Sequence, residues 1–531
     1  MCQAESLTGT VKTMITPELL LFTANFLLVL AVFLLILKKK SIEFILPVAG
    51  KAVVVLLIIF TAFFGYKYLL DTEKKEWGST SRLYSDVYDL KSLVGKMGIM
   101  NFFIEDTFKY VLRSNLVSAA DTSFLNNFAK NRKISETTNP KYFGAEKGKN
   151  VIIIQVESLE NAVINQTIGG DEITPNLNKL AKEGLYFDNY YTQVGPGNTA
   201  DAEFSTLNSL YPLPDDVAFI DYAKNQYYAL PQLLRNNNYD TYSLHGDVPT
   251  FWNRSNIYPE LGYEKAFDLD DYVVTRPVGK GPSDLGDEDL FSQSLPKLEN
   301  MKQPFMATVI TMSSHTPFIL PDDLQTLQIP DQTNLTPTQW EYLQSVHYTD
   351  KAIGEFIDGL KKDGLFDNSL IFIWGDHGSF TNISSALGQD KNTLQELSNS
   401  QVPMILFAPK TDLQGTDNIP ASHLDIYPTI TNLLGIKTPK TIFGQDILNT
   451  KTPVETHFEL VSGGIDAILT PNLAYTADDG GQFQNGYCKS WPDKKPLAVS
   501  ACQNLYNQQQ ENVKASDIII RGNLLNVLKT K

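Results

Sequence analysis

The stretch SLIFIWGDHG at residues 369–378 decides the fold and also points to the chemistry. Its first six residues are almost continuously apolar, which is typical of a strand buried on both faces of a parallel sheet. VIIIQV at residues 151–156 has the same character, and further candidate strands lie at residues 241–244, 305–311 and 402–407. Helical stretches alternate with these strands, so we expect an α/β protein with a mostly parallel sheet sandwiched by helices.

Two of the intervening helices have clear boundaries. Thr174 and Pro175 supply a cap and a proline in the first turn of a helix that ends before Gly184. A second helix is expected from about residue 425 to Gly435.

Residues that follow the strands are rich in groups that bind metals. Ligands gather at the carboxyl ends of parallel strands. Glu157 follows residues 151–156, and the pair Asp376 and His377 follows residues 369–374. These three side chains could bind a hard divalent cation, although Glu157 alone could equally cap a helix and the Asp-His pair could be an ordinary turn.

The other strand ends carry histidines and an acid. His315 follows residues 305–311, and His245 and Asp247 follow residues 241–244. The chain contains only 6 His, and three of them, His245, His315 and His377, follow candidate strands. This clustering favours a single site at one edge of the sheet.

A glycine-rich turn, GPGNTADAEF at residues 195–204, leads into another expected helix. Thr199 lies at or near the start of this helix, where free N–H groups and the helix dipole favour an oxyanion or a phosphate. A simple threonine cap would explain the same pattern.

Composition and charge exclude several classes of protein. The 531 residues include 3 Cys and carry a formal net charge of −16, which argues against a small disulfide-rich fold and against nucleic-acid binding. Residues 1–75 hold 8 Lys and 5 acidic residues, so the remainder carries −19.

The basic end of the chain is also its most apolar part. Residues 19–37 contain no charge and would span about 28 Å as a helix, close to the hydrocarbon thickness of a bilayer. Residues 52–66 form a second expected transmembrane helix, and a buried hairpin is the alternative. Lys38, Lys39, Lys40 and Lys51 between them mark the cytoplasmic side, so we expect a multi-pass cell-membrane protein whose later residues are extracytoplasmic.

These features predict four parts: a membrane anchor at 1–70, a juxtamembrane helical connector at 71–149, a catalytic domain at 150–450 and a polar, turn-rich C-terminal extension at 451–531. Outside the cytoplasm, Cys488 and Cys502 could form a disulfide, or they could be two free thiols.

Six motifs together resemble the lipoteichoic acid synthase family, the membrane-anchored phosphoglycerol transferase branch of the sulfatase and alkaline phosphatase superfamily. They are VESL at 156–159, GNTADAEF at 197–204, HGD at 245–247, WNR at 252–254, SSHTPF at 313–318 and GDHG at 375–378. The resemblance covers about residues 145–450.

The resemblance implies both a fold and a reaction. It implies one divalent metal ion, typically Mn²⁺ with Mg²⁺ or Zn²⁺ as alternatives, bound by Glu157, Thr199, Asp376 and His377, with Thr199 as the nucleophile. It also implies a phosphoglycerol pocket formed by His245, Asp247, Trp252, Arg254 and His315. Phosphatidylglycerol would be the donor, and a membrane glycolipid or a glycerol-phosphate chain would be the acceptor.

Other functions remain open at this point. The chain could be a primase that adds only the first unit, another head-group transferase such as a phosphoethanolamine transferase, or an inactive scaffold of envelope assembly. Asn198 departs from the family, whose members often have Lys before the nucleophile. A sulfatase would need Cys or Ser where Thr199 stands.

Overall fold

The computed structural model describes residues 83, 88–99, 101–104, 106–107, 117–132, 139–279, 281, 284–389, 395–450, 454–458, 465–478 and 482–529. The chain divides into two compact units, residues 1–116 with 250–252, and residues 117–249 with 253–531. In the described ranges no helix has both the length and the apolarity to cross a membrane. The two spans expected at residues 19–37 and 52–66 lie outside those ranges, and the expected four-part division stays a prediction.

The first unit contains the helix α6 (Leu90–Met97). The Asp89 side chain caps it by accepting a hydrogen bond from the Ser92 N–H at 3.0 Å. Within the same unit the Tyr88 ring contacts the Trp252 ring, with centroids 5.8 Å apart.

The larger unit is built on a nine-stranded sheet with the order β10-β4-β9-β8-β1-β7-β5-β6, and β11 pairs with β4. Its strands are β1 (Asn150–Val156), β4 (Leu185–Tyr191), β5 (Asp240–His245), β6 (Lys265–Phe267), β7 (Phe305–Ile310), β8 (Ser369–Gly375), β9 (Gln401–Phe407), β10 (Gly415–Asp417) and β11 (Ala421–Ser422). Only β9 runs antiparallel to its neighbours, β4 and β8. The expected α/β fold with a mostly parallel sheet is therefore confirmed, and all five expected strands are present.

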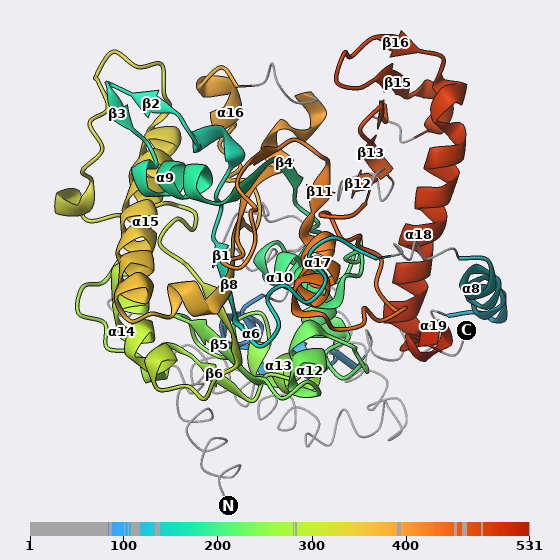
Figure 1. The fold of residues 1–531 in the computed structure, drawn as a ribbon, viewed down its shortest axis with the longest axis horizontal. Coiled ribbons are helices and arrows are strands. Elements are labelled where there is room, and N and C mark those ends of the chain that lie inside the picture. The colour runs from blue at the N-terminus through green and yellow to red at the C-terminus, as the bar shows by residue number, and fades with distance from the viewer. Residues whose placement is uncertain are drawn as a thin grey trace, which may run out of the picture. The chain divides into compact units, whose positions relative to one another are not determined.

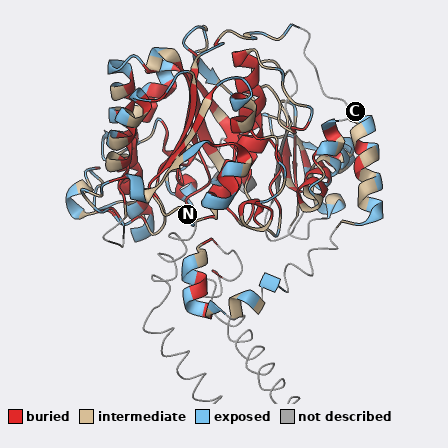
Figure 2. Cartoon of the chain, turned by 90° about the horizontal axis from the view of Figure 1, so that it is seen from below, coloured by how far each residue is buried: buried red, intermediate tan, exposed pale blue. Residues whose placement is uncertain are grey.

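Helices cover both faces of this sheet (Figure 1). The helices of the larger unit are α8 (Ala119–Asn131), α9 (Pro175–Glu183), α10 (Thr199–Asn208), α11 (Ala218–Asp221), α12 (Leu230–Arg235), α13 (Arg254–Leu261), α14 (Asp287–Glu299), α15 (Pro337–Lys362), α16 (Ile383–Ala386), α17 (Ile426–Leu434), α18 (Gln503–Gly522) and α19 (Asn526–Lys529). α9, α14 and α15 pack with one face of the sheet in a single hydrophobic cluster. Figure 2 shows the buried strands lying between layers of helix.

The two expected helices are confirmed with one local difference. α9 starts at Pro175 and ends before Gly184, and α17 ends before Gly435, which has the left-handed conformation with φ 69°. Thr174 stands in the capping position of α9, but its hydroxyl donates instead to the Val163 carbonyl at 3.1 Å. Thr174 therefore stands at the capping position without capping the helix through its side chain. Its hydroxyl instead links α9 to the loop after β1 by a hydrogen bond.

The central strands converge on one edge of the sheet. β8, β1, β7 and β5 are consecutive neighbours and all parallel, so their carboxyl ends meet at the same edge. The register pairs Val156 of β1 with Gly375 of β8. The residues that follow each of these strands are thus brought together by the sheet itself.

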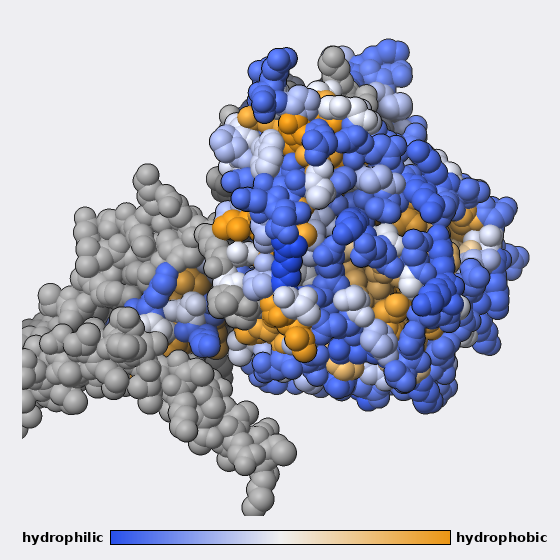
Figure 3. Space-filling model, turned by 90° about the vertical axis from the view of Figure 1, so that its left-hand side faces the viewer, coloured by the Kyte–Doolittle hydropathy of each residue, from blue (hydrophilic) through white to orange (hydrophobic). Residues whose placement is uncertain are grey.

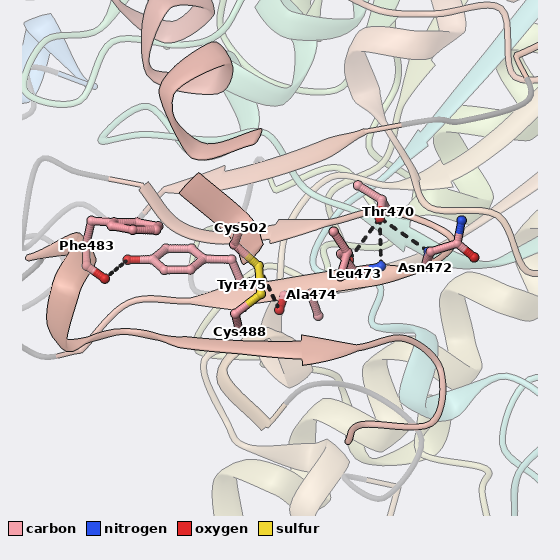
Figure 4. The surroundings of a disulfide bond; sticks show 8 residues. All are labelled: Thr470, Asn472, Leu473, Ala474, Tyr475, Phe483, Cys488 and Cys502. Carbon is pink, nitrogen blue, oxygen red and sulfur yellow. Dashed lines mark hydrogen bonds between the residues drawn. A yellow bond between two sulfur atoms is a disulfide. The ribbon is translucent and has the colours of Figure 1, made fainter. Parts of the chain in front are cut away.

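The C-terminal residues are more ordered than their turn-rich composition predicted. They form an antiparallel sheet of β12 (Glu455–Phe458), β13 (Ile465–Leu469), β14 (Leu473–Thr476), β15 (Tyr487–Ser490) and β16 (Pro496–Leu497). Cys488 of β15 and Cys502 form a disulfide with their Cα atoms 6.0 Å apart, next to the ring of Tyr475 (Figure 4). The expected pairing is confirmed in this structure.

Among the described residues, β2 (Thr167–Ile168) and β3 (Asp171–Glu172) form a separate two-stranded ribbon. On the face shown in Figure 3, hydrophilic residues predominate and hydrophobic residues form separate patches.

Candidate active site

Two carboxylates lie side by side at the carboxyl edge of the sheet. Glu157 follows β1 and Asp376 follows β8, and both are buried. One oxygen of Asp376, Oδ1, accepts hydrogen bonds from the backbone N–H groups of Ser158 and His377, both at 2.7 Å. The other oxygen, Oδ2, is buried without a hydrogen-bond partner in the described structure. An unpaired buried carboxylate oxygen is costly unless something else binds it.

The hydroxyl of Thr199 faces this pair. Thr199 is the first residue of α10, and its Oγ1 lies 3.2 Å from Glu157 Oε2 and 3.3 Å from His377 Nε2. Its backbone carbonyl accepts a hydrogen bond from Gln155 Nε2 at 3.2 Å. The sheet therefore fixes the start of α10 directly over the two carboxylates.

His377 is oriented by its own loop. Its Nδ1 lies 2.9 Å from the Gly378 carbonyl. A carbonyl only accepts, so Nδ1 carries the hydrogen, and in the neutral ring Nε2 holds the lone pair. Nε2 lies 3.3 Å from Glu157 Oε1 and 3.7 Å from Asp376 Oδ2. A histidine held through one nitrogen by a carbonyl is the usual arrangement of a metal ligand.

These three side chains fit a divalent cation. Glu157, Asp376 and His377 each offer one ligand atom, and the three atoms lie within 4.8 Å of one another. Two carboxylates and an imidazole suit hard or borderline divalent ions. The unpaired Oδ2 of Asp376 is the observation that supports the fit, because a cation would satisfy it.

The pKa values of Asp376 and His377 reflect the burial and the close spacing of these ligand groups. Burial, and then the charge of Glu157, raise the pKa of Asp376 to about 8. Burial acts against the charged imidazole, but Asp376 and Glu157 outweigh it and raise the pKa of His377 to about 10. Without a cation, protons would have to compensate the two buried carboxylates.

A pocket of about 160 Å³ opens beside β5 and β6. His245, Asp247 and Arg254 are among its lining residues. His245 Nδ1 lies 3.1 Å from the Ile310 carbonyl, so Nδ1 carries the hydrogen and Nε2 is an acceptor. Burial, and then Arg254, lower the pKa of His245 to about 3, and the ring is neutral at physiological pH.

Arg254 is buried and paired with an acid of α10. Its Nε and Nη2 both donate to Glu203 Oε2 at 3.2 Å. Burial acts to lower the pKa of Arg254, but Tyr258 and the carboxyl groups of Glu203 and Asp247 act in the opposite direction and raise it above its ordinary value. The guanidinium is therefore charged, and its third nitrogen, Nη1, has no partner in the described structure.

The two remaining expected site residues differ in position. His315 follows β7 and is close enough to Glu157 for an electrostatic interaction, so it belongs to the same edge of the sheet. Its Nδ1 lies 2.7 Å from the Thr316 carbonyl. Trp252 falls in the first unit, where it contacts Tyr88, and its part in the pocket stays a prediction.

A buried acid that the sequence analysis did not single out shapes the turn before Thr199. Asp201 Oδ2 accepts hydrogen bonds from the N–H groups of Gly195 at 2.9 Å and Gly197 at 2.8 Å. A Cβ on Gly197 would lie 2.7 Å from the Asp201 carboxyl group, so a larger residue does not fit there. An acid in the first helical turn after a glycine-rich stretch was the available signal.

Two further buried acids hold the loops of the site. Glu160 accepts from the N–H of Ser379 at 2.7 Å, two residues beyond His377. Asp287 accepts from the N–H of Met312 at 2.8 Å, and also from Ser313, just before His315. Neither acid lies in a recognisable motif, so the sequence offered no signal for them.

Comparisons with known proteins agree with this geometry. The sulfatase family model matches residues 149–436. Lipoteichoic acid synthase 1 of Bacillus subtilis is 32% identical, over 84% of this chain and 69% of that protein. The chain belongs to the lipoteichoic acid synthase family. The lipoteichoic acid synthase of Staphylococcus aureus is 30% identical, over 94% of this chain and 75% of its own length.

Solved structures show the same fold. A lipoteichoic acid synthase from Listeria monocytogenes superimposes with a TM-score of 0.66 at 30% identity, over 76% of this chain and 97% of that one. An alkaline phosphatase superfamily protein from Vibrio parahaemolyticus gives 0.58 at 20% identity, over 78% and 98%, and supports the fold alone. Membership in these families makes the chain an enzyme of the transferase or hydrolase kind, in a metal-dependent superfamily.

Proposed function

We propose that this lipoteichoic acid synthase family member transfers phosphoglycerol from phosphatidylglycerol to a glycerol-phosphate chain or a glycolipid anchor, through a covalent intermediate on Thr199. One observation carries the proposal. The Thr199 hydroxyl lies 3.2 Å from Glu157 and 3.3 Å from His377, at the start of a helix that points its N–H groups at the site.

Glu157, Asp376, His377 and Thr199 are the residues that would hold the metal ion, for which Mn²⁺ is the first choice and Mg²⁺ or Zn²⁺ the alternatives. A bound divalent cation would favour the deprotonated hydroxyl and offset negative charge on the phosphoryl oxygens. The structure supports this set because Asp376 Oδ2 otherwise has no partner.

Different residues of the pocket would contact different groups of the donor lipid. The Arg254 guanidinium is charged, and it would bind a phosphoryl oxygen. His245 is neutral with Nε2 as an acceptor, so it would accept a hydrogen bond from a glycerol hydroxyl. We assign to His315 the proton that the leaving group needs, because His245 at a pKa of about 3 cannot supply it near pH 7.

The reaction then has two displacements. The Thr199 hydroxyl loses its proton as Oγ1 forms a bond to phosphorus, the phosphorus–oxygen bond to diacylglycerol breaks, and the released alkoxide takes a proton from His315. An acceptor hydroxyl next loses its proton as it forms a bond to the same phosphorus, and the bond to Thr199 breaks as the Thr199 oxygen takes a proton back. The balance requires no further reactant, and it predicts ping-pong kinetics.

The membrane enters as part of the proposal. Phosphatidylglycerol is held in a bilayer by about 0.8 kcal/mol per buried methylene, so the enzyme must work at the membrane surface. The basic, apolar residues 1–70 would provide the anchor, with the catalytic residues outside the cytoplasm.

The test is diacylglycerol release. The full chain is mixed with phosphatidylglycerol labelled in its head group and with Mn²⁺, and Thr199→Ala is the control. We expect release from the unaltered chain, with label retained on the protein, and neither signal from Thr199→Ala. Equal release from both proteins would refute the nucleophile.

A second assay separates a polymerase from a primase. A glycolipid that already carries one glycerol phosphate is supplied as the acceptor. Products longer by several units would exclude a strictly priming enzyme.

A further inference from the structure

The helix that carries Thr199 also carries the partner of Arg254. Glu203 lies four residues after Thr199 on α10, so the two side chains are on the same side of the helix. All ten residues of α10 are buried, and the helix cannot shift without disturbing its surroundings. The position of Arg254 is therefore tied to the position of the nucleophile.

The contact fixes which part of the guanidinium remains available. Glu203 Oε2 takes both Nε and Nη2 of Arg254, and the two side chains are only 1% and 3% exposed. Nη1 has no partner in the described structure. A ligand oxygen that binds this arginine must use Nη1 or the second N–H of Nη2, because Nε and one N–H of Nη2 already donate to Glu203.

The Glu203 carboxylate also offsets the positive charge of Arg254. Burial raises the pKa of Glu203, but the adjacent guanidinium opposes that rise and favours the ionised carboxylate. A buried guanidinium beside a buried carboxylate has almost no net charge to offer a ligand, yet it still donates hydrogen bonds. Among the described residues that line the pocket, Asp247, Glu264 and Asp268 are acidic, and Lys265 is the other base besides Arg254. The neutral His245 adds no positive charge.

We infer that Glu203 makes this site selective for phosphate diesters, which carry one negative charge, over phosphate monoesters, which carry two. The inference rests on the proposed function, in which Arg254 binds the phosphoryl group of the donor. A phosphate monoester with two negative charges would bind next to an arginine whose charge Glu203 offsets. The rest of the pocket has more acidic than basic residues. Glu203 is thus a specificity-determining and positioning residue that does not itself touch the substrate.

The experiment measures binding rather than turnover. Glycerol 1-phosphate is the monoester, and glycerophosphoglycerol, the deacylated head group of the proposed donor, is the diester. Both are titrated calorimetrically at pH 8 into the full chain loaded with Mn²⁺. Glu203→Gln removes the charge and keeps the shape, and Glu203→Asp keeps the charge. Glu260→Gln is the matched control, because Glu260 is on the same helix as Arg254 but is partly exposed and pairs with Lys224.

We expect the unaltered chain to bind the diester at least as tightly as the monoester. In Glu203→Gln the ratio of the two affinities should move toward the monoester by about tenfold or more, as Coulomb's law gives for one charge several ångströms from a phosphate at an effective dielectric constant of about 20. Glu203→Asp and Glu260→Gln should keep the original ratio. General damage to the site would weaken both ligands together and leave the ratio unchanged.

Two results would overturn the inference. One is an unchanged ratio in folded Glu203→Gln. The other needs no variant, and it is a preference of the unaltered chain for the monoester by tenfold or more. If diacylglycerol release fails while the ratio shifts as expected, the proposed donor is wrong and the role of Glu203 stands.

Discussion

Asp201 should be the acid on which the shape of the nucleophile turn depends. Its Oδ2 accepts from two backbone N–H groups, those of Gly195 and Gly197, and the side chain is completely buried. We expect Asp201→Ala to lower both the stability and the activity, and Asp201→Asn to change them much less. The difference between the two variants isolates the hydrogen bonds from the charge.

The magnitude follows from the contacts that each variant loses. Asp201→Ala leaves two buried N–H groups without a partner, at about 1–3 kcal/mol each, so we expect a loss of about 3 kcal/mol in the free energy of unfolding. Asparagine keeps one acceptor oxygen for the glycines. Burial raises the pKa of Asp201 to about 7, so its charged form is already disfavoured and removing the charge should cost about 1 kcal/mol or less.

Activity should follow the same order. A displaced turn moves the Thr199 hydroxyl relative to Glu157, and a shift of about 1 Å in a reacting group costs about a hundredfold in rate. Urea denaturation measures the stability, and diacylglycerol release under saturating donor measures kcat. The reasoning fails if Asp201→Ala unfolds within 1 kcal/mol of the unaltered chain, or if the alanine and asparagine variants have equal kcat.

Three further outcomes are expected. A chelator should abolish diacylglycerol release, and Mn²⁺ should raise the Tm of the unaltered chain but not that of Asp376→Ala; an equal rise in both would place the ion elsewhere. Replacing Cys488 and Cys502 by serine should lower the free energy of unfolding by about 3 kcal/mol, since the bridge closes a loop of 14 residues; thermal denaturation that is identical with and without the bridge would contradict this. Burial raises the pKa of Asp446 to about 6 and that of its neighbour Asp425 to about 7, so the free energy of unfolding should fall as pH rises from about 4 to 7, because the unfolded chain loses these protons first. Asp446→Asn should flatten that fall, and a slope unaffected by the substitution would show that the group is not responsible.

The strands could be predicted because the signal is local. Val151 to Val156 and Ser369 to Trp374 are buried on both faces, so each is a continuous apolar run. Strand β4 was missed because LYFDNYY has a polar centre and resembles a loop. The long helix α15 was also missed, since its polar and buried residues do not stand out without the sheet against which it packs.

The candidate site could be predicted in part, for a geometric reason. Parallel strands end at a common edge, so Glu157 and Asp376 meet there whatever lies between them in the sequence. The supporting acids could not be predicted in this way. Glu160 and Asp287 act by accepting backbone hydrogen bonds from loops that the fold brings to them, and such partners leave no pattern in the sequence.

The net charge of −16 makes this local organisation necessary. An acidic enzyme has no general attraction for an anionic lipid head, so recognition must come from a few positive groups placed inside the fold. Burying such a group demands a partner, and Arg254 has Glu203. The same pairing that makes burial tolerable removes the surplus charge with which a doubly charged phosphate could be held. Selectivity for a phosphate diester is therefore a physical consequence of burying Arg254 beside an acid. Substitution of Glu203 should reduce this selectivity while Arg254 stays buried.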